Sequence, residues 1–357
     1  MLVIRPVTLN DLDAIEALTG FTGFGLTTLP RDAKLLSRRI KESLRGFEKL
    51  TDDDRPRGET YLFVLEDLDN HHVAGTCGIV SKVGGFEPFY AYRIESTVHQ
   101  SEMLGVRKEI RMLHLDEEHD GPCEIGSLFL SPEYRKDGNG RLLSLSRFLF
   151  MADHAEYFDP MVIAEMRGVV DEQGRSPFWD AIGHHFFDID FPKADYLSMV
   201  NKRFIADLMP KHPIYVPLLP KEAQEVIGKV HKQTEPALKI LEEEHFRQSG
   251  QVDIFEGGPV VRCPLKEIRT IHDSVCTQVE ELSNAPVAGE TYLVANTRHD
   301  FRACKATLEL TPQGTVRMDA KTAEALRLKA GDAVRFATPR PSPKQEEAVD
   351  VDDVALY

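Results

Sequence analysis

The sequence predicts an α+β protein, with a mixed, mostly antiparallel sheet flanked by helices and a small β-barrel-like region at the C-terminal end. Two observations predict this class. Up to about residue 270, β-type runs and amphipathic helical segments are interspersed as a meander, without regular strand–helix alternation. From about residue 290 the sequence changes to short strand-like segments, such as TYLVANT at 291–297 and TVRMD at 315–319.

The first 83 residues contain the patterns of two helices and three strands. Apolar residues at helical spacing predict helices over 8–20 and 32–47, the second with Asp32 in the N-cap position. Three β-type runs predict strands at residues 2–7, 60–67 and 71–83, of which the last two are joined by the turn-like DLDNHH.

The middle of the chain combines an irregular stretch with a strand–loop–helix pattern. The region between the strand ending at residue 83 and the next strand is polar and irregular and predicts no regular element. CEIGSLFL at 123–130 predicts a strand that leads directly into a loop. The following segments predict a long helix over 141–158, a strand over 161–170 and a short helix over 176–187 capped by Ser176.

A second block begins near Phe204. MPKHPIYVPLLP, at 209–220, is too rich in proline for regular structure. Helical patterns follow over 221–230 and 234–246, the second opened by Thr234 as a cap, and QVDIFEGGP predicts a strand that ends in a Gly-Gly-Pro turn.

Composition excludes several classes of function. The 357 residues carry a formal net charge of −15, which argues against a broad surface for nucleic acid or an anionic membrane. The five cysteines are scattered without Cys-x-x-Cys spacing, which argues against a disulfide framework or a zinc ribbon. No apolar run approaches the ~20 residues of a membrane-spanning helix, and the N-terminus meets charge at Arg5, unlike a signal peptide. We therefore expect a soluble cytoplasmic protein without a metal site.

SPEYRKDGNGRLL, at 131–143, has the composition of an anion-binding loop. It lacks the Gly-Lys-Ser/Thr of a Walker loop, and Leu143 stands where a dinucleotide fingerprint requires its third glycine. The pattern R-x-x-G-x-G remains, formed by Arg135, Gly138 and Gly140. Glycines let a backbone approach a ligand, and helix amides attract an anion. The alternative interpretation is a glycine-rich turn with solvated basic residues.

Three segments resemble the GCN5-related N-acetyltransferase superfamily. VIRPVTLNDLDAIEAL, at 3–18, resembles its opening strand and helix. EIGSLFLSPEYRKDGNGRLLS, at 124–144, resembles its acyl-CoA motif, and MVIAEMRG, at 161–168, resembles the next strand. This resemblance implies a GCN5-related N-acyltransferase fold, in which two parallel strands splay apart, pantetheine pairs with the opened strand edge, and pyrophosphate lies on the loop amides.

Longer segments in the same order resemble the arginine N-succinyltransferase family. They are LTTLP at 26–30, IAEMRGVVDEQGRSPFW at 163–179, MPKHPIY at 209–215, GKVHKQT at 228–234 and DIFEGGP at 253–259. The resemblance implies transfer of a succinyl group from succinyl-CoA to the α-amino group of L-arginine, the first step of an arginine catabolic pathway. Some members also accept ornithine. It further implies that no cofactor is permanently bound and that the chain forms a homo-oligomer or a heteromer with a similar subunit.

The sequence pattern and the resemblance together divide the chain, and the resemblance assigns candidate binding residues. An acyl-CoA-binding domain is expected at 1–200, a block that completes it at 201–270, a small β-rich domain at 271–340 and a disordered tail at 341–357. The strand backbone at Leu128 and Leu130 would pair with pantetheine. The loop residues expected to bind the pyrophosphate are Arg135, Lys136, Gly138, Asn139, Gly140 and Arg141.

His231 is the candidate catalytic residue, because GKVHKQTEPA matches the family segment that holds the proposed proton donor. Histidine is the natural proton carrier near neutral pH, although a histidine that merely ends a helix is the simpler interpretation of this position. Many members of the superfamily protonate the thiolate with a tyrosine from the helix after the splayed strand, and SPFWDAIGHHFF has none.

The residues that hold the acceptor amine are less defined by the sequence. Gly25–Leu29 would line the arginine pocket, and Glu165 or the acids of VVDEQG could pair with the guanidinium. EEHDGPCEIGS, at 117–127, departs from the family pattern and leaves another acyl-CoA or another amine as an alternative. A third alternative is a non-catalytic partner subunit.

Overall fold

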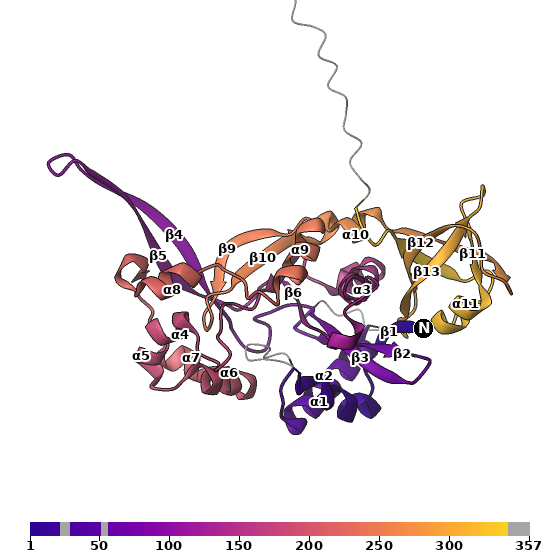
Figure 1. The fold of residues 1–357 in the computed structure, drawn as a ribbon, viewed down its shortest axis with the longest axis horizontal. Helices are drawn as coiled ribbons and strands as arrows, with labels where there is room; N and C mark the ends of the chain where they lie inside the picture. Colours follow the sequence, from indigo (N-terminus) through magenta and orange to yellow (C-terminus); the bar gives the residue numbers. More distant parts are fainter. Residues whose placement is uncertain (22–28, 51–55, 342–357) are drawn as a thin grey trace, which may run out of the picture.

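The computed structural model describes residues 1–21, 29–50 and 56–341. The predicted pocket segment Gly25–Leu29 lies outside the described residues except for Leu29, and so does the tail beyond residue 341. Figure 1 shows an elongated molecule with a main sheet and its helices in the middle. A barrel lies at one end, and a long hairpin projects from the other.

The described strands form one continuous sheet of fifteen strands in the order β12-β15-β11-β14-β13-β1-β2-β3-β6-β7-β10-β9-β4-β5-β8. Among them, only the β6–β7 and β11–β14 pairs are parallel, which confirms the predicted mixed, mostly antiparallel sheet. The strands are β1 (Leu2–Pro6), β2 (Thr60–Asp67), β3 (His72–Val80), β4 (Phe89–Ser101), β5 (Val106–Glu118), β6 (Cys123–Leu130), β7 (Met161–Glu165), β8 (Ile214–Tyr215), β9 (Arg247–Asp253), β10 (Pro259–Pro264), β11 (Val275–Ser283), β12 (Glu290–Asn296), β13 (Ala303–Leu310), β14 (Val316–Asp319) and β15 (Ala333–Ala337).

Local capping signals in the sequence explain where several helices begin. The Asp32 carboxylate accepts hydrogen bonds from the amides of Lys34 and Leu35, as its N-cap position predicts, and Ser176 accepts one from the Trp179 amide. Thr234 occupies the predicted N-cap position of α9, although its side chain makes no capping bond. The helices are α1 (Leu12–Thr19), α2 (Ala33–Lys49), α3 (Asn139–Asp153), α4 (Pro177–Ala181), α5 (His184–Phe187), α6 (Phe191–Val200), α7 (Arg203–Leu208), α8 (Lys221–Val226), α9 (Glu235–Glu243), α10 (Arg269–Asp273) and α11 (Ala320–Leu326).

Helix α3 is the central helix of the fold. Nearly all of its side chains are buried, because it packs against β3 on one side and against α9, α10 and the barrel strand β12 on others. A helix that is buried on every side loses the amphipathic pattern of a surface helix. The predicted helix over 141–158 is too long, since the backbone leaves the helical region at His154 and a 3-10 turn follows.

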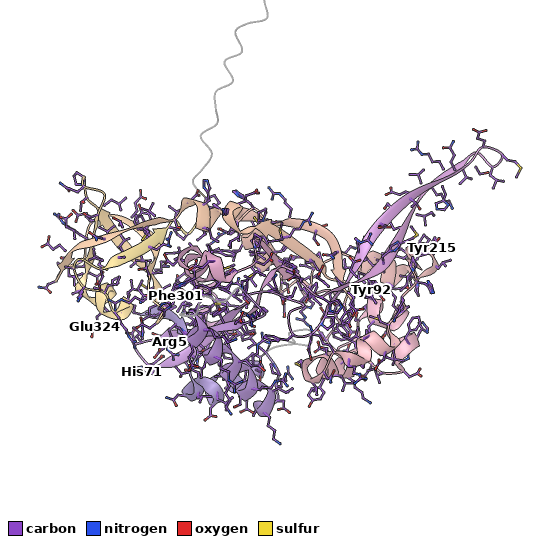
Figure 2. All side chains as sticks on the ribbon, turned by 180° about the vertical axis from the view of Figure 1, so that it is seen from behind. Arg5, His71, Tyr92, Tyr215, Phe301 and Glu324 are labelled. Carbon is purple, nitrogen blue, oxygen red and sulfur yellow. The ribbon has the colours of Figure 1, made fainter. Side chains whose placement is uncertain are left out.

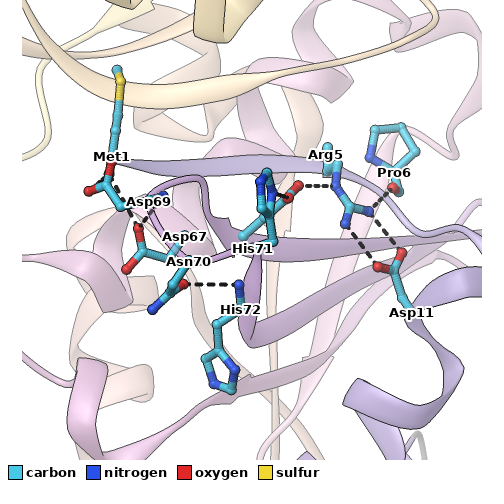
Figure 3. Close-up of polar contacts among 10 residues, drawn as sticks. Met1, Arg5, Pro6, Asp11, Asp67, Asp69, Asn70, His71 and His72 are labelled. Atoms are coloured by element: carbon cyan, nitrogen blue, oxygen red, sulfur yellow. Dashed lines mark hydrogen bonds and ion pairs between the residues drawn. The ribbon is translucent and has the colours of Figure 1, made fainter.

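Strand β1 joins the main sheet to the barrel, because β2 pairs with one of its edges and β13 with the other. Ion pairs hold β1 in place (Figure 3). The Arg5 guanidinium donates two hydrogen bonds of 2.8 Å to the Asp11 carboxylate, and its Nε donates to Glu66 of β2. At this junction the Phe301 ring, labelled in Figure 2, packs on the main sheet. Its centroid lies 5.6 Å from that of Phe63 in β2, so aromatic packing continues across the junction.

The C-terminal region is a closed five-stranded barrel. Strands β12, β15, β11, β14 and β13 pair in that order, and β13 pairs back with β12. This closure confirms the β-barrel-like region predicted from the short strands. Its hydrophobic cluster includes Leu308, Met318 and Phe336, together with Val3 of β1.

The expectation of an irregular segment between residues 84 and 122 is wrong. Strands β4 and β5 form a regular antiparallel hairpin with thirteen paired positions, from Phe89–Glu118 to Ser101–Val106. Most of the outer part of this hairpin is exposed on both faces, so its strands lack the apolar–polar alternation by which a half-buried strand is recognised. Within the described residues, no helix is long and apolar enough to cross a membrane.

Candidate active site

The parallel strands β6 and β7 are in contact only at their beginning. Cys123 pairs with Val162 and Glu124 with Ile163, and beyond these two pairs β6 follows β3 whereas β7 follows β10. The two strands therefore diverge, and the edge of β6 that faces β7 is left without a strand partner in the described structure. This edge includes Leu128 and leads to Leu130.

A β-bulge interrupts β6 where it leaves β7. Gly78 of β3 pairs with Gly126 and Thr76 with Phe129, so β6 carries one extra residue at this point. Ser127 has the left-handed φ of 52°, and its carbonyl accepts a hydrogen bond of 2.8 Å from the Thr76 hydroxyl. A bulge turns backbone groups out of the sheet ladder, which makes them available to a ligand on the open edge.

The loop after β6 ends at the N-terminus of α3. Asp137 and Gly138 are consecutive residues with left-handed φ values of 53° and 76°. A side chain added at Gly138 or Gly140 would meet no atom within 4 Å, so the space above both backbones is open. Successive amides in this conformation, together with the positive end of a fifteen-residue helix, attract an anion.

The loop residues have different functions in this arrangement. Arg135 and Lys136 are exposed, and the Arg135 Nε donates a bond of 2.9 Å to the Leu130 carbonyl. The Asn139 side chain is buried and donates to the Tyr134 carbonyl, so it also supports the loop. Arg141 forms a 2.7 Å ion pair with Glu243 of α9, which offsets its charge.

A cavity of about 710 Å³ lies between the diverging strands. All the predicted binding residues of β6 and of the loop line it, from Leu128 to Arg141. Its other walls come from the end of β7, from α6 and α9, and from the segment after β9. The divergence of β6 and β7 thus brings the whole predicted acyl-CoA segment to one cavity.

Carboxylates gather at the end of the cavity where β6 and β7 are still paired. Glu124 is the second residue of β6, Glu165 ends β7 and Asp253 ends β9. Burial raises the pKa of Glu124, against the opposing charges of Lys202 and Arg39. Glu165 is accessible from the cavity, and its enclosure by the cavity walls, followed by the charges of Glu124 and Asp253, raises its pKa above the usual value. The three carboxylates, hereafter the acidic cluster, repel one another and are not fully compensated by nearby cations.

Glu256 extends the acidic cluster into the wall of the cavity. Its side chain is only 4 % exposed, and Oε2 accepts a 2.8 Å hydrogen bond from the Gly168 amide. Oε1 has no hydrogen-bond partner within the described structure. Burial, followed by the charge of Asp253, raises the pKa of Glu256 well above its usual value. An unsatisfied buried carboxylate in a cavity wall favours a cationic ligand.

Two cationic side chains, Arg167 and Lys202, also line the cavity. Burial lowers the pKa of Arg167, and its Nε has no hydrogen-bond partner in the described structure. A third cation, Arg147 of α3, is occupied within the fold, because its Nε donates to the Ser144 carbonyl and its Nη1 to the Gly126 carbonyl. Arg147 therefore supports the backbone beside the bulge.

His231 lies next to the cavity but is not among the residues that line it. Its amide donates to the Arg167 carbonyl over 2.9 Å, and the following residues Gln233 and Thr234 line the cavity. The imidazole Nδ1 accepts a 3.1 Å hydrogen bond from the Gln233 amide. Burial, with the charge of Arg167, lowers the pKa of His231, so the ring is neutral near pH 7 with its proton on Nε2.

The acidic cluster is the part of the site that sequence reasoning missed, apart from Glu165. Glu124 and Asp253 stand in strand-like segments far apart in the chain, and only the order of strands in the sheet brings them together. The described residues contain no group of three or more His, Cys, Asp or Glu side chains that could hold a metal ion.

Comparison with known proteins gives consistent matches over the whole fold. The family model for the arginine N-succinyltransferase beta subunit matches residues 2–270, and the model for the C-terminal domain of that subunit matches residues 275–338. Together they cover both the main sheet and the barrel.

Individual relatives match over nearly their full length. The chain is 46 % identical to an arginine N-succinyltransferase of Salmonella schwarzengrund over 340 residues, which is 94 % of this chain and 97 % of that one. It is 44 % identical to an arginine N-succinyltransferase of Yersinia pestis over 346 residues, 95 % of this chain and 98 % of that one. The solved structure of arginine/ornithine succinyltransferase subunit AI from Pseudomonas aeruginosa matches with a TM-score of 0.86 at 35 % identity, covering 96 % of this chain and 99 % of that chain.

Proposed function

The chain belongs to the arginine N-succinyltransferase family, and from this premise we propose how its cavity transfers a succinyl group from succinyl-CoA to the α-amino group of L-arginine. The enzyme is an acyltransferase of arginine catabolism, and its reaction is the first step of the succinyltransferase pathway. One observation carries the proposal: an open strand edge and an anion-binding loop share a cavity with the acidic cluster.

Succinyl-CoA is proposed to lie along β6. Its pyrophosphate would bind the amides at Gly138 and Gly140 with Arg135 and Lys136 beside them, and its pantetheine would pair with the β6 backbone around Leu128. The loop follows the end of β6, so a pantetheine arm that runs back along the strand carries the thioester toward Glu124. The reacting carbon then reaches the acidic end of the cavity.

Arginine is proposed to bind at the acidic cluster. A substrate with a guanidinium and an α-ammonium carries two positive charges, and Glu124, Glu165 and Asp253 offer carboxylates with too few cations around them. Arg167 and Lys202 are the cations in the cavity wall for the carboxylates of arginine and of the succinyl group. This division of charge would separate a succinyl from an acetyl enzyme.

The chemistry needs one proton to leave the α-ammonium and one group to stabilise the departing thiolate. A carboxylate whose pKa is raised accepts a proton more readily near neutral pH, so the acidic cluster is suited to take the ammonium proton. His231 is proposed to donate from Nε2 to the sulfur as the thioester breaks. For this role the ring has to turn from the Gln233 amide toward the cavity.

Several finer statements accompany this function. We propose that β1 to β7 with α1 to α3 form the GCN5-related N-acyltransferase fold, supported by the diverging parallel strands. A domain boundary near residue 271 is supported by the two family models, which end at 270 and begin at 275. Assembly with a second copy or a similar subunit is supported by the similar Pseudomonas aeruginosa protein, which is named subunit AI of arginine/ornithine succinyltransferase. The cytoplasmic location stays a prediction from the five free cysteines, of which only Cys276 is exposed.

The test is release of free thiol from acyl-CoA by the purified protein. Succinyl-CoA with arginine should give rapid release, and acetyl-CoA with arginine at least tenfold slower release. Absence of release with succinyl-CoA and arginine would reject the proposal. Ornithine and lysine in place of arginine test the alternative that another amine is the acceptor, and a product analysis by mass spectrometry identifies the succinylated nitrogen.

A further inference from the structure

The strands in the outer part of the β4–β5 hairpin pair only with each other in the described structure. At its root, β9 pairs with Ala91–Arg93 and β8 pairs with Met112 and Leu113. Farther out, β4 and β5 pair only with each other, as far as Ser101 and Val106. Figures 1 and 2 show this part, residues 96–111 and hereafter the arm, extending away from the remaining fold, with Tyr215 beside its root.

The arm is too long to be explained as a simple connection. At about 3.3 Å per residue, the six positions from Ser96 to Ser101 extend about 20 Å from the root. A two-stranded hairpin on its own is only marginally stable in water, because neither face is covered. Regular pairing to the tip therefore favours a partner that covers one face.

One face of the arm carries an apolar groove of about 410 Å³. Val106 and Ile110 of β5 lie in its floor, Leu104 lies at the tip, and the segment after β8 closes the root end with Pro217 and Leu218. Leu104 is 68 % exposed and Leu218 82 %, and Met103 beside Leu104 is 90 % exposed. Contiguous exposed apolar side chains of this kind mark association surfaces.

The charge of the arm favours an acidic partner. Residues 96–111 carry three basic side chains (Arg107, Lys108 and Arg111) against two acidic ones (Glu102 and Glu109), a net charge of +1. The whole chain carries −15, so the remainder carries −16. Two such bodies repel each other over most of their surfaces. The arm is a segment on which a second acidic copy can come close without that repulsion.

We propose that the arm binds a second copy of this chain, with Met103 and Leu104 at the tip of each arm in the groove of the other. The contact is reciprocal about a two-fold axis, so each copy contributes one tip and one groove. The apolar wall at Leu218 receives the partner's tip, and the basic side chains of each arm face the acidic body of the other copy.

Sedimentation equilibrium of the purified full chain tests the proposal. The expected wild-type mass is twice 40.3 kDa, and Met103→Asp/Leu104→Asp should raise the dissociation constant by at least about 100-fold. Leu310→Asp is the matched control, because Leu310 is 52 % exposed on the barrel, and its mass should equal the wild type. A monomeric wild type, or a double variant that associates as the wild type does, would overturn the proposal.

Leu218→Asp is an independent variant on the groove side of the same contact. It should weaken association as strongly as the tip variants, although it lies outside the hairpin. Circular dichroism and thermal unfolding of each variant establish whether it is folded. If the tip variant does not fold, Leu218→Asp still tests the contact. A folded Leu218→Asp protein with wild-type association would also overturn the proposed groove.

Discussion

Replacement of Glu165 by glutamine tests the proposed arginine site most directly. Glutamine keeps the shape of the side chain and removes its charge. A hydrogen bond to a charged group contributes about 1.5–3 kcal/mol, which corresponds to roughly a 10- to 100-fold change in affinity. The lower half of this range is expected, because removal of one carboxylate relieves the repulsion on Glu124 and Asp253, which then ionise more fully and compensate in part.

The assay measures thiol release, first with arginine varied at saturating succinyl-CoA and then with succinyl-CoA varied at saturating arginine. In Glu165→Gln the KM for arginine should rise about 10- to 30-fold, whereas the KM for succinyl-CoA should change less than about threefold. Glu133→Gln is the matched control, since Glu133 is exposed and outside the cavity lining. An arginine KM within about twofold of the wild type in a folded Glu165→Gln enzyme would refute the assignment while leaving the succinyltransferase activity itself unaffected.

The pH dependence of the same site has a defined sign. Because folding raises the pKa of Glu165 above its ordinary value of 4.5, protonation of this group stabilises the fold, and that contribution is lost as the pH rises through the folded-state pKa. In the proposed site, arginine binds the ionised form of Glu165. The shift in Tm that saturating arginine produces should therefore increase with pH above 4.5, and the increase should be smaller in Glu165→Gln.

Three further substitutions address the other parts of the structure. His231→Ala should lower kcat by about 10²- to 10⁴-fold with both KM values nearly unchanged, and a kcat close to that of the wild type would remove the proton role of His231. Gly140→Val fills the open space above the loop amides and should raise the KM for succinyl-CoA at least tenfold while the arginine KM stays constant; equal effects on both would contradict the loop assignment. Glu244→Ala leaves the buried Arg269 guanidinium without the carboxylate that lies 2.6 Å away, so urea unfolding should show a loss of about 3–5 kcal/mol, and a loss below about 1 kcal/mol would show that this buried pair contributes little.

Local patterns in the sequence predict the strand, the loop and the helix that line the proposed succinyl-CoA side of the cavity. The glycines at 138 and 140, the strand before them and the apolar segment after them lie within about twenty residues. The strand–loop–helix motif can therefore be recognised without knowledge of the fold. The small barrel was predictable for the same reason, since its short strands are close in the chain. Resemblance to a family supplied what the patterns could not, namely the succinyl group and arginine.

Features that depend on distant segments could not be predicted from the residues alone. The acidic cluster joins the second residue of β6 to the last residues of β7 and β9, and each carboxylate taken alone has the pattern of an ordinary strand residue. The sequence predicts Arg141 as a phosphate ligand, but it does not show the ion pair of 2.7 Å that Arg141 forms with Glu243 in the fold. The arm was not predicted because both of its faces are exposed. Its strands therefore lack the alternation of apolar and polar residues by which a half-buried strand is recognised.

The pairing of β1 with β13 has a consequence for how the chain acquires its structure. Val3 lies opposite Cys304 and Ile4 opposite Ala303, so this contact closes a loop of about 300 residues. During synthesis the main sheet can form around β2, β3 and β6 long before the ribosome has produced β13. Until then, the edge of β1 that pairs with β13 has no partner strand. An exposed strand edge is a template for pairing with other chains. The interval between the synthesis of residue 67 and that of residue 304 is therefore the period in which a nascent chain most needs protection from aggregation, and rapid barrel closure should improve the yield of folded enzyme.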